Sequence, residues 1–163
     1  MKYSILKSLK EFIKSGKNIN ISDFGSFGKD SFMPNNAIIS NAKNIFLADH
    51  VIIGDSPILY ATNAKIIIKK YFVSAIGLKI STGNHERRIG RFLASITENE
   101  KNHNVGLDKD VIINEDVWLG FNVTIMAGVE IGRGCTIAAG SVVTRSLPPY
   151  SVSCLAYVKI CQM

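Results

Sequence analysis

A six-residue repeat runs from Val111 to Ser146. Read in sixes, this stretch is VIINED, VWLGFN, VTIMAG, VEIGRG, CTIAAG and SVVTRS. The third residue of every six is aliphatic: Ile113, Leu119, Ile125, Ile131, Ile137 and Val143. A helix needs apolar residues three and four apart, and a single long strand needs unbroken alternation, so neither fits. A period of six is typical of a solenoid of very short strands joined by tight corners.

The first residue of each six is also apolar or small: Val111, Val117, Val123, Val129, Cys135 and Ser141. The same spacing occurs earlier in the chain, slips by three residues around Asn63–Lys65 and then resumes. The aliphatic or small positions of that earlier stretch are Leu47, Ile53, Leu59, Ile68, Ser74 and Ile80. A slip inside a strand would turn every side chain to the other face, so we place it at a corner.

Two segments precede and interrupt these coils. Residues 1–17 carry an apolar stripe at helical spacing, which predicts a short amphipathic helix. This helix packs on the first coil or a neighbouring subunit, or binds an anionic lipid surface. Residues 19–82 predict coils that are irregular up to Ala42 and regular afterwards. Residues 83–110 are polar and break the pattern, which predicts a functional loop extruded from one corner.

Residues 111–147 are expected to form regular coils. The tail, residues 148–163, is expected to leave the solenoid after Pro148–Pro149 and to run back along it.

Composition narrows the class of protein. Hydrophobic residues make up 47% of the 163, yet no apolar run approaches the roughly 18 residues of a membrane span, so the excess indicates a core and a subunit interface. The three cysteines lack paired or metal-type spacing, which favours reduced thiols and the cytoplasm. The net charge of +6 is spread out, which disfavours nucleic acid and suits a phosphate-bearing acyl carrier or an anionic polysaccharide precursor.

The segment NEDVWLGFNVTIMAGVEIGRGCTIAAGSVVTRSLPPYS resembles the last coils of the hexapeptide-repeat acyltransferases that O-acetylate sugars. That branch includes galactoside and maltose acetyltransferases and those of capsule and exopolysaccharide synthesis. The resemblance is close over Lys79–Ser151 and looser over Ile45–Ile80. It implies an all-β, single-stranded, left-handed parallel β-helix with three hexads per coil. It also implies acetyl-CoA as the acyl donor, a sugar or lipid-linked saccharide acceptor, and a homotrimer with active sites between subunits.

His85 is the candidate catalytic residue. It lies in STGNHERRIGRF, where the coils give way to the loop, and the resembling family has its general base in a similar Gly-Asn-His context. A sugar hydroxyl must lose its proton as it attacks a thioester, and an imidazole accepts that proton at neutral pH. Asn84 is its candidate substrate-binding neighbour. The donor for the oxyanion is expected to be a backbone N–H at a corner.

The acyl-donor site follows from the resemblance as well. Trp118 matches a tryptophan beside the donor groove, and it could equally be a ring that covers a corner. Arg145 could meet a phosphate of coenzyme A or be a solvated corner charge. The positions that match the coenzyme-binding set are Trp118, Gly120, Ala139, Thr144, Arg145 and Lys159.

A metal site is disfavoured. γ-type carbonic anhydrases share the β-helix and bind zinc through three histidines, two of them close together. Here His50, His85 and His103 are separated by 35 and 18 residues, and His103 lies in the loop rather than on a rigid coil. The sequence therefore predicts an acyltransferase without a metal.

Departures from the family pattern leave the function open. Phe121 replaces a small residue beside the groove, Ser146 replaces an Asp, and Cys154–Lys159 lacks the Gly and Pro of the family's closing segment. We predict an acetyl-CoA-dependent O-acetyltransferase for a carbohydrate hydroxyl, in capsule or exopolysaccharide synthesis. The alternatives are an N-acetyltransferase for an amino sugar or antibiotic, and a trimeric scaffold that has lost donor binding.

Overall fold

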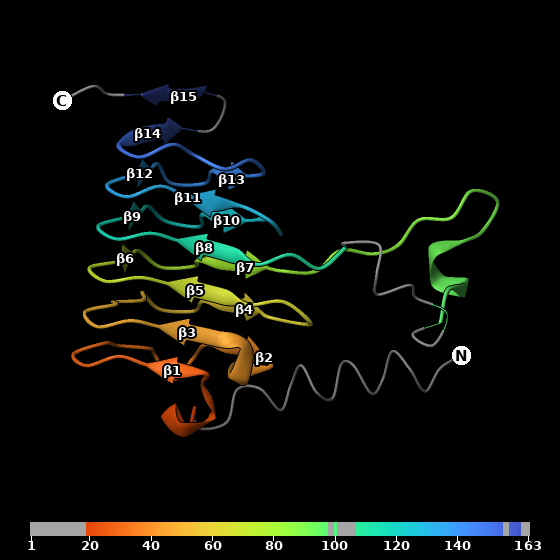
Figure 1. The fold of residues 1–163 in the computed structure, drawn as a ribbon, viewed down its shortest axis with the longest axis horizontal. Helices are drawn as coiled ribbons and strands as arrows, with labels where there is room; N and C mark the ends of the chain where they lie inside the picture. Colours follow the sequence, from red (N-terminus) through yellow and green to blue (C-terminus); the bar gives the residue numbers. More distant parts are fainter. Residues whose placement is uncertain (1–18, 98–99, 101–106, 155–156, 161–163) are drawn as a thin grey trace.

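Very short strands dominate the structure. The computed structural model describes residues 19–97, 100, 107–154 and 157–160, the last four by their backbone alone. In this part of the chain fifteen strands form three sheets, and every pairing is parallel except that of β14 with β15. The sheets are stacked as the three sides of a prism (Figure 1), with each coil of chain lying on the one before.

We number the sheets in the order in which the chain visits them. Sheet I contains β1 (Ser26–Phe27), β3 (Ile45–Leu47), β5 (Ile66–Ile68), β8 (Val111–Ile113) and β11 (Glu130–Ile131). Sheet II contains β6 (Val73–Ser74), β9 (Trp118–Leu119), β12 (Thr136–Ile137), β14 (Ser151–Cys154) and β15 (Tyr157–Ile160). Sheet III contains β2 (Ile38–Ser40), β4 (Ile58–Tyr60), β7 (Lys79–Ser81), β10 (Thr124–Ile125) and β13 (Val142–Val143).

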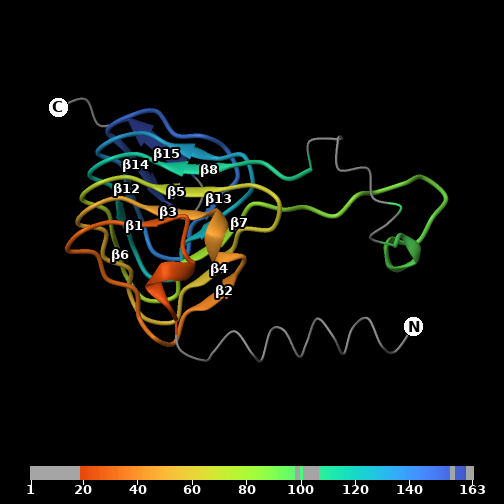
Figure 2. The same ribbon diagram turned by 60° about the horizontal axis from the view of Figure 1, so that its bottom comes forward.

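Three 3₁₀ turns complete the described elements: η1 (Ile21–Asp23), η2 (Ala42–Asn44) and η3 (Leu93–Ser95). The chain passes from sheet I to II to III and back to I on every coil, which Figure 2 shows obliquely along the prism. This is the left-handed parallel β-helix that the resemblance implied, and each strand from β3 to β13 buries one or two side chains.

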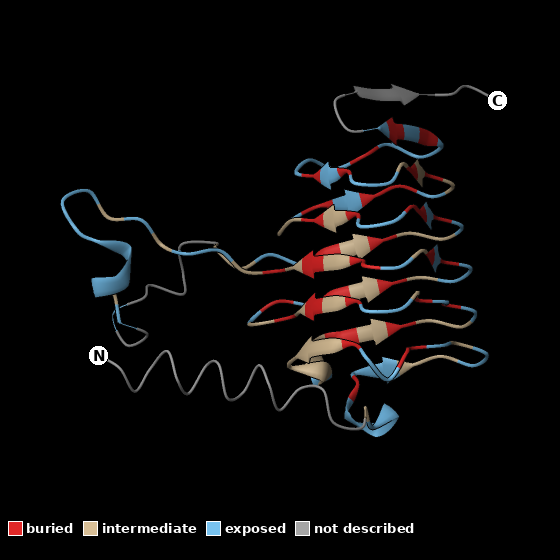
Figure 3. Cartoon of the chain, turned by 180° about the vertical axis from the view of Figure 1, so that it is seen from behind, coloured by how far each residue is buried: buried red, intermediate tan, exposed pale blue. Residues whose placement is uncertain are grey.

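The hexad positions form the core. All six third positions from Ile113 to Val143 are buried, as are all six first positions from Val111 to Ser141. Each buried aliphatic side chain contributes about 1.5–3 kcal/mol, so the repeat itself stabilises the prism. The inward Ser74 is polar, but its Oγ accepts a hydrogen bond from the Gly54 N–H at 3.2 Å. Figure 3 shows buried and exposed positions alternating along the coils.

Departures from the regular six-residue repeat lie at the corners between strands. The three-residue slip at Asn63–Lys65 falls between β4 and β5, at a corner as predicted. Several corners need a positive φ, and at Gly134 the angle is +69°. A Cβ on Gly134 would also lie 2.5 Å from the Tyr150 ring of the next coil, so glycine is required there twice over.

The expected exit of the tail at Pro148–Pro149 is wrong. Leu147 still forms a bridge with Ile131, and β14 pairs in parallel with β12 as a further rung of sheet II. The two prolines occupy a corner, where a missing N–H costs no ladder bond. Only after Cys154 does the chain reverse, so that β15 pairs antiparallel with β14.

The start of the chain agrees in part with its irregular hexads. Phe27 lies on β1 and Met33 is buried, whereas Ile21 lies in η1 and is largely exposed. The helix predicted for residues 1–17 lies outside the described residues, as does His103.

Candidate functional site

His85 stands at the start of a loop that projects from the prism. We call the line of corners between sheets III and I the III/I edge; β7 ends there at Ser81, and the next strand on sheet I is β8. Figure 1 shows the loop leaving from this side of the molecule. Asn84 and His85 are both exposed, and His85 makes no hydrogen bond or ion pair with any other described residue. Its imidazole is therefore available to a ligand.

The root of the loop is held by polar contacts between its two limbs. The Asn84 side-chain amide donates to the Leu107 carbonyl at 3.3 Å, and the Lys109 N–H donates to the Thr82 carbonyl at 2.9 Å. On the returning limb, the Asp108 carboxylate accepts from the Asn63 amide at 2.6 Å. These bonds fix the outgoing and returning limbs against each other directly beside His85.

Gly83 lies close to two side chains at this root. A Cβ on Gly83 would lie 2.7 Å from the Thr62 hydroxyl oxygen and 2.9 Å from Asp108 Oδ1. The Thr62 hydroxyl is buried without a hydrogen-bond partner among the described residues. A larger residue at position 83 would therefore have to displace the side chain of Thr62 or Asp108.

The far end of the loop has its own ion pairs. Arg88 pairs with Glu86 at 2.6 Å, and Arg91 pairs with Glu100 at 2.9 Å. The Arg91 guanidinium, together with the N–H and hydroxyl of Thr97, lowers the pKa of Glu100 to about 2. Beside these pairs lies an open cavity of about 470 Å³ whose lining is arginine and apolar side chains: Arg87, Arg88, Ile89, Arg91, Phe92 and Leu93.

The predicted donor residues fall at two different edges of the prism. Thr144 and Arg145 follow β13 at the III/I edge, on the same side as the loop root and two coils beyond it, and both are exposed. Gly120 and Ala139 lie together at the corner between sheets II and III. A Cβ on Gly120 would come within 2.6 Å of the Ala139 nitrogen, so the close stacking of these two corners needs glycine.

Trp118 lies on β9 in sheet II, and 47% of its surface is exposed. Figure 1 places β9 on the side of the prism opposite the loop, so one chain does not bring Trp118 and His85 together. Lys159 lies on β15, where its backbone is opposite Val152, and its side chain is outside the described residues.

The outer face of sheet II is apolar. One outward residue on each rung is paired with the outward residue of the next rung, so that these residues form a single row. The row consists of Phe32, Ile52, Val73, Trp118, Thr136 and Val152. All of these except Thr136 are large hydrophobic side chains left exposed. Sheet II therefore presents an exposed apolar row, and this row includes the tryptophan.

The residues that depart from the family pattern have local explanations. Phe121 turns outward and is largely exposed at its corner. The Ser146 hydroxyl accepts from the Glu130 N–H at 2.9 Å, which ties the last corner to sheet I.

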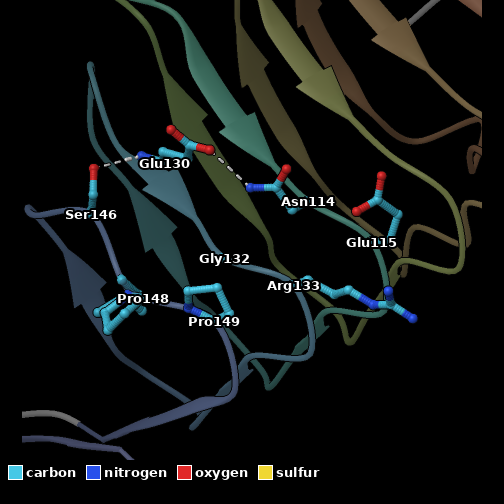
Figure 4. A pocket seen from close by; sticks show the side chains of 9 residues that line it. Asn114, Glu115, Glu130, Gly132, Arg133, Ser146, Pro148 and Pro149 are labelled. Atoms are coloured by element: carbon cyan, nitrogen blue, oxygen red, sulfur yellow. Dashed lines mark hydrogen bonds between the residues drawn. The ribbon is translucent and has the colours of Figure 1, made fainter.

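A cleft of about 410 Å³ lies beside Ser146, between polar side chains of sheet I and the prolines of the last corner (Figure 4). Its walls are Asn114, Glu115, Glu130, Gly132, Arg133, Ser146, Leu147, Pro148 and Pro149. The Asn114 amide donates to Glu130 Oε1 at 3.0 Å, so these two polar side chains of the cleft are bonded to each other. The outward polar side chains of sheet I were its only sequence signal.

His50 and Cys135, which lie outside the loop, have structural neighbours. His50 stacks on Tyr71, with ring centroids 5.1 Å apart and planes 3° apart. Cys135 is buried and its thiol donates to the Pro148 carbonyl at 3.2 Å. Among the residues that the structure describes, no three His, Cys, Asp or Glu side chains gather as a metal site would need.

Known proteins share this repeat and this fold. Residues 110–145 match the family model described as bacterial transferase hexapeptide, six repeats. The repeat is that of the hexapeptide transferases. A protein of Lysinibacillus sphaericus named as a macrolide acetyltransferase is 58% identical over 43 residues, which are 26% of this chain and 24% of that protein. The chain thus spans about a quarter of the length of this relative.

Solved structures extend the similarity to the whole fold. A maltose O-acetyltransferase from Clostridium difficile 630 has a TM-score of 0.65 at 22% identity, over 99% of this chain and 89% of that one. A mutant of AntD, an N-acyltransferase from Bacillus cereus crystallised with coenzyme A and a dTDP-amino sugar, has a TM-score of 0.68 at 20% identity, over 98% of this chain and 89% of that one. At these identities the likeness concerns the fold.

Across the described residues, no helix combines the length and the apolarity needed to cross a bilayer.

Proposed function

We propose that the chain is an acetyl-CoA-dependent O-acetyltransferase that uses His85 as general base on a carbohydrate hydroxyl. The observation that carries the proposal is an exposed imidazole without a hydrogen-bond partner at the braced root of a loop, on a hexapeptide β-helix. The fold is shared with a maltose O-acetyltransferase and with an acyltransferase that binds coenzyme A, which supports the acyl donor.

In the proposed reaction His85 accepts one proton from the acceptor and later gives it to the leaving thiolate. The acceptor hydroxyl oxygen attacks the acetyl carbonyl carbon while His85 takes its proton. A C–O bond forms, a tetrahedral oxyanion develops, and collapse breaks the C–S bond. The imidazolium then returns the proton to the thiolate of coenzyme A. General base catalysis of this kind supplies roughly 10²–10⁴-fold in rate.

The donor site in this proposal is assembled from both edges. The exposed Ala139 leaves room for the pantetheine arm beside Trp118, and the buried Gly120 permits the close stacking of that corner, while Thr144 and Arg145 meet the phosphates, with Lys159 from the tail. Arg145 has no ion pair with a described residue, so its charge is available to a phosphate. Asn84 contacts the acceptor or holds the loop through Leu107.

A homotrimer would bring the candidate residues of the two edges together in one site between subunits. His85 follows β7 at the III/I edge and Trp118 lies on sheet II, on the opposite side of one prism, so the loop of one subunit must reach the sheet II side of the next to complete a site. The exposed apolar row on sheet II favours coverage by another copy. We place the enzyme in the cytoplasm, where acetyl-CoA and saccharide precursors of capsule or exopolysaccharide are available.

The test is a His85→Ala variant assayed for thiol release from acetyl-CoA, with maltose and a methyl galactoside as acceptors. Turnover should fall by roughly two orders of magnitude or more while the oligomer stays intact by size-exclusion chromatography. His50→Ala is the matched control, because it removes an exposed histidine at another edge, and it should retain activity. Wild-type turnover in His85→Ala would rule out the mechanism.

A further inference from the structure

The outer face of sheet III carries a row of hydroxyl side chains that ends at the loop root. On the three-residue strands of this sheet, the last residue of each strand points outward because the residue before it is inward. The strand register places Ser40 opposite Tyr60 and Tyr60 opposite Ser81. We call Ser40, Tyr60 and Ser81 the hydroxyl row.

The row joins the two halves of the proposed active site. The Ser81 hydroxyl donates to the Gly83 carbonyl at 3.2 Å, two residues before His85. In the other direction along sheet III, Ile80 is opposite Ile125 and Ile125 is opposite Val143. The next positions therefore lead from Ser81 past Met126 to Thr144, a predicted donor residue. The loop root therefore lies between two parts of the same edge: Thr144, a predicted donor residue, is on one side of it, and Tyr60 and Ser40 are on the other, which we call the hydroxyl side.

The hydroxyl side is accessible and has unused hydrogen-bonding capacity. Ser40 and Tyr60 are both half-buried, and their hydroxyls have no hydrogen-bond partner among the described residues. A hydroxyl both donates and accepts, and a tyrosine ring adds an apolar face beside its polar tip. That combination suits a sugar ring, which offers hydroxyls on its rim and C–H groups on its faces.

The row contains no acidic or basic side chain. Its outward neighbour Lys79 directs its amine away, toward the Gly77 carbonyl at 3.1 Å and the Asn122 side chain at 3.3 Å. Two carboxylates lie at the same edge: Asp108 accepts a hydrogen bond from the Asn63 amide at 2.6 Å, and Asp110 accepts one from the Lys65 N–H at 2.7 Å. An ammonium group on an acceptor would therefore find no free carboxylate among the row residues, whereas a neutral hydroxyl would find partners.

We infer that the hydroxyl row is the acceptor subsite and that it selects an uncharged saccharide over an amino sugar. The inference rests on the proposed acetyltransferase function. Three rungs are separated by two spacings of about 4.8 Å, so the row spans about 10 Å, which accommodates a short saccharide beside His85. Tyr60, at its centre, is the principal contact.

The experiment measures thiol release with maltose, methyl galactoside or glucosamine as acceptor, on the full chain. Tyr60→Ala should raise the KM for the two neutral sugars by about tenfold or more and leave the KM for acetyl-CoA within about twofold. Tyr60→Phe keeps the ring and loses one hydrogen bond, so its KM should rise by roughly two- to tenfold. Tyr71→Ala, which removes a largely exposed tyrosine at another corner, is the matched control.

The outcomes separate the two proposals. An active wild-type enzyme whose acceptor KM is unchanged in Tyr60→Ala, or that prefers glucosamine, would overturn the acceptor subsite and leave the acetyltransferase standing. If the wild type releases no thiol with any acceptor, the proposed function fails. In that case saturation-transfer NMR with maltose tests the row directly: a signal in wild type that is lost in Tyr60→Ala supports it, and an equal signal or none in both overturns it.

Discussion

The regular coils and the extruded loop are built on opposite principles. In the coils, a buried aliphatic side chain on almost every rung contributes to the core, and the polar groups of the backbone satisfy one another in parallel ladders. In the described part of the loop, apolar side chains such as Ile89 and Phe92 are 106% and 86% exposed, and its shape depends on side-chain ion pairs and hydrogen bonds. The scaffold is therefore stabilised by packing, while the candidate catalytic group is positioned by a few polar contacts.

The largest effect should come from the packed side of this comparison. Ile125→Ala removes a fully buried side chain between two rungs of sheet III, so the free energy of unfolding should fall by about 2–5 kcal/mol. Ile89→Ala makes the same change on a fully exposed side chain and should alter the free energy of unfolding by about 0.5 kcal/mol or less. Chemical denaturation measures both. Equal losses would mean that the loop is packed against something as firmly as the core.

A smaller effect is expected at the loop root, and it should appear in activity more than in stability. Asn63→Ala removes the 2.6 Å bond to Asp108 and loosens the returning limb of the loop, whose outgoing limb carries His85. Since one hydrogen bond is worth about 1 kcal/mol, kcat should fall by roughly three- to tenfold with little change in Tm.

Asn36→Ala is the matched control for that variant. Asn36 makes a comparable side-chain bond to Ser56 at 3.2 Å, at a corner far along the chain from the loop. It should leave kcat unchanged. Equal losses of kcat in both variants would show a general loss of stability rather than a positioning role for Asn63.

The smallest effect concerns pH and the far end of the loop. The pKa of Glu100 is lowered to about 2 by Arg91 and Thr97, so its contribution is fully present above the unfolded value near 4.5 and is lost as pH falls through about 2. Hydrogen exchange of the loop should therefore be unchanged, after correction for intrinsic rates, between pH 7 and pH 5. In Glu100→Gln the loop should exchange faster throughout that range. Equal exchange in the variant and wild type would mean that this ion pair does not order the loop.

Sequence reasoning succeeded where a local pattern had a local cause. The third and first hexad positions predicted the core from Val111 to Val143, and the three-residue slip predicted a corner, because both follow from which face of a strand points inward. The exit of the loop after Ser81 was visible as the end of the pattern.

The remainder depended on contacts between residues far apart in the chain. Nothing around Asn63 predicts that it bonds Asp108, 45 residues away, and nothing around Pro148 shows that Leu147 still finds Ile131. The hydroxyl row emerges only once the register of sheet III is known. The roles of His85 and the donor residues came from resemblance, and they remain predictions.

The most direct test of the account is a subunit-mixing experiment. His85→Ala lacks the base, and Ala139→Trp fills the exposed donor corner, so each variant alone should release little thiol. If each site combines His85 of one subunit with the donor corner of another, unfolding the two variants together and refolding them should restore a measurable share of wild-type turnover. A mixture as inactive as its separate components, with mixed oligomers shown by mass spectrometry, would contradict the shared site.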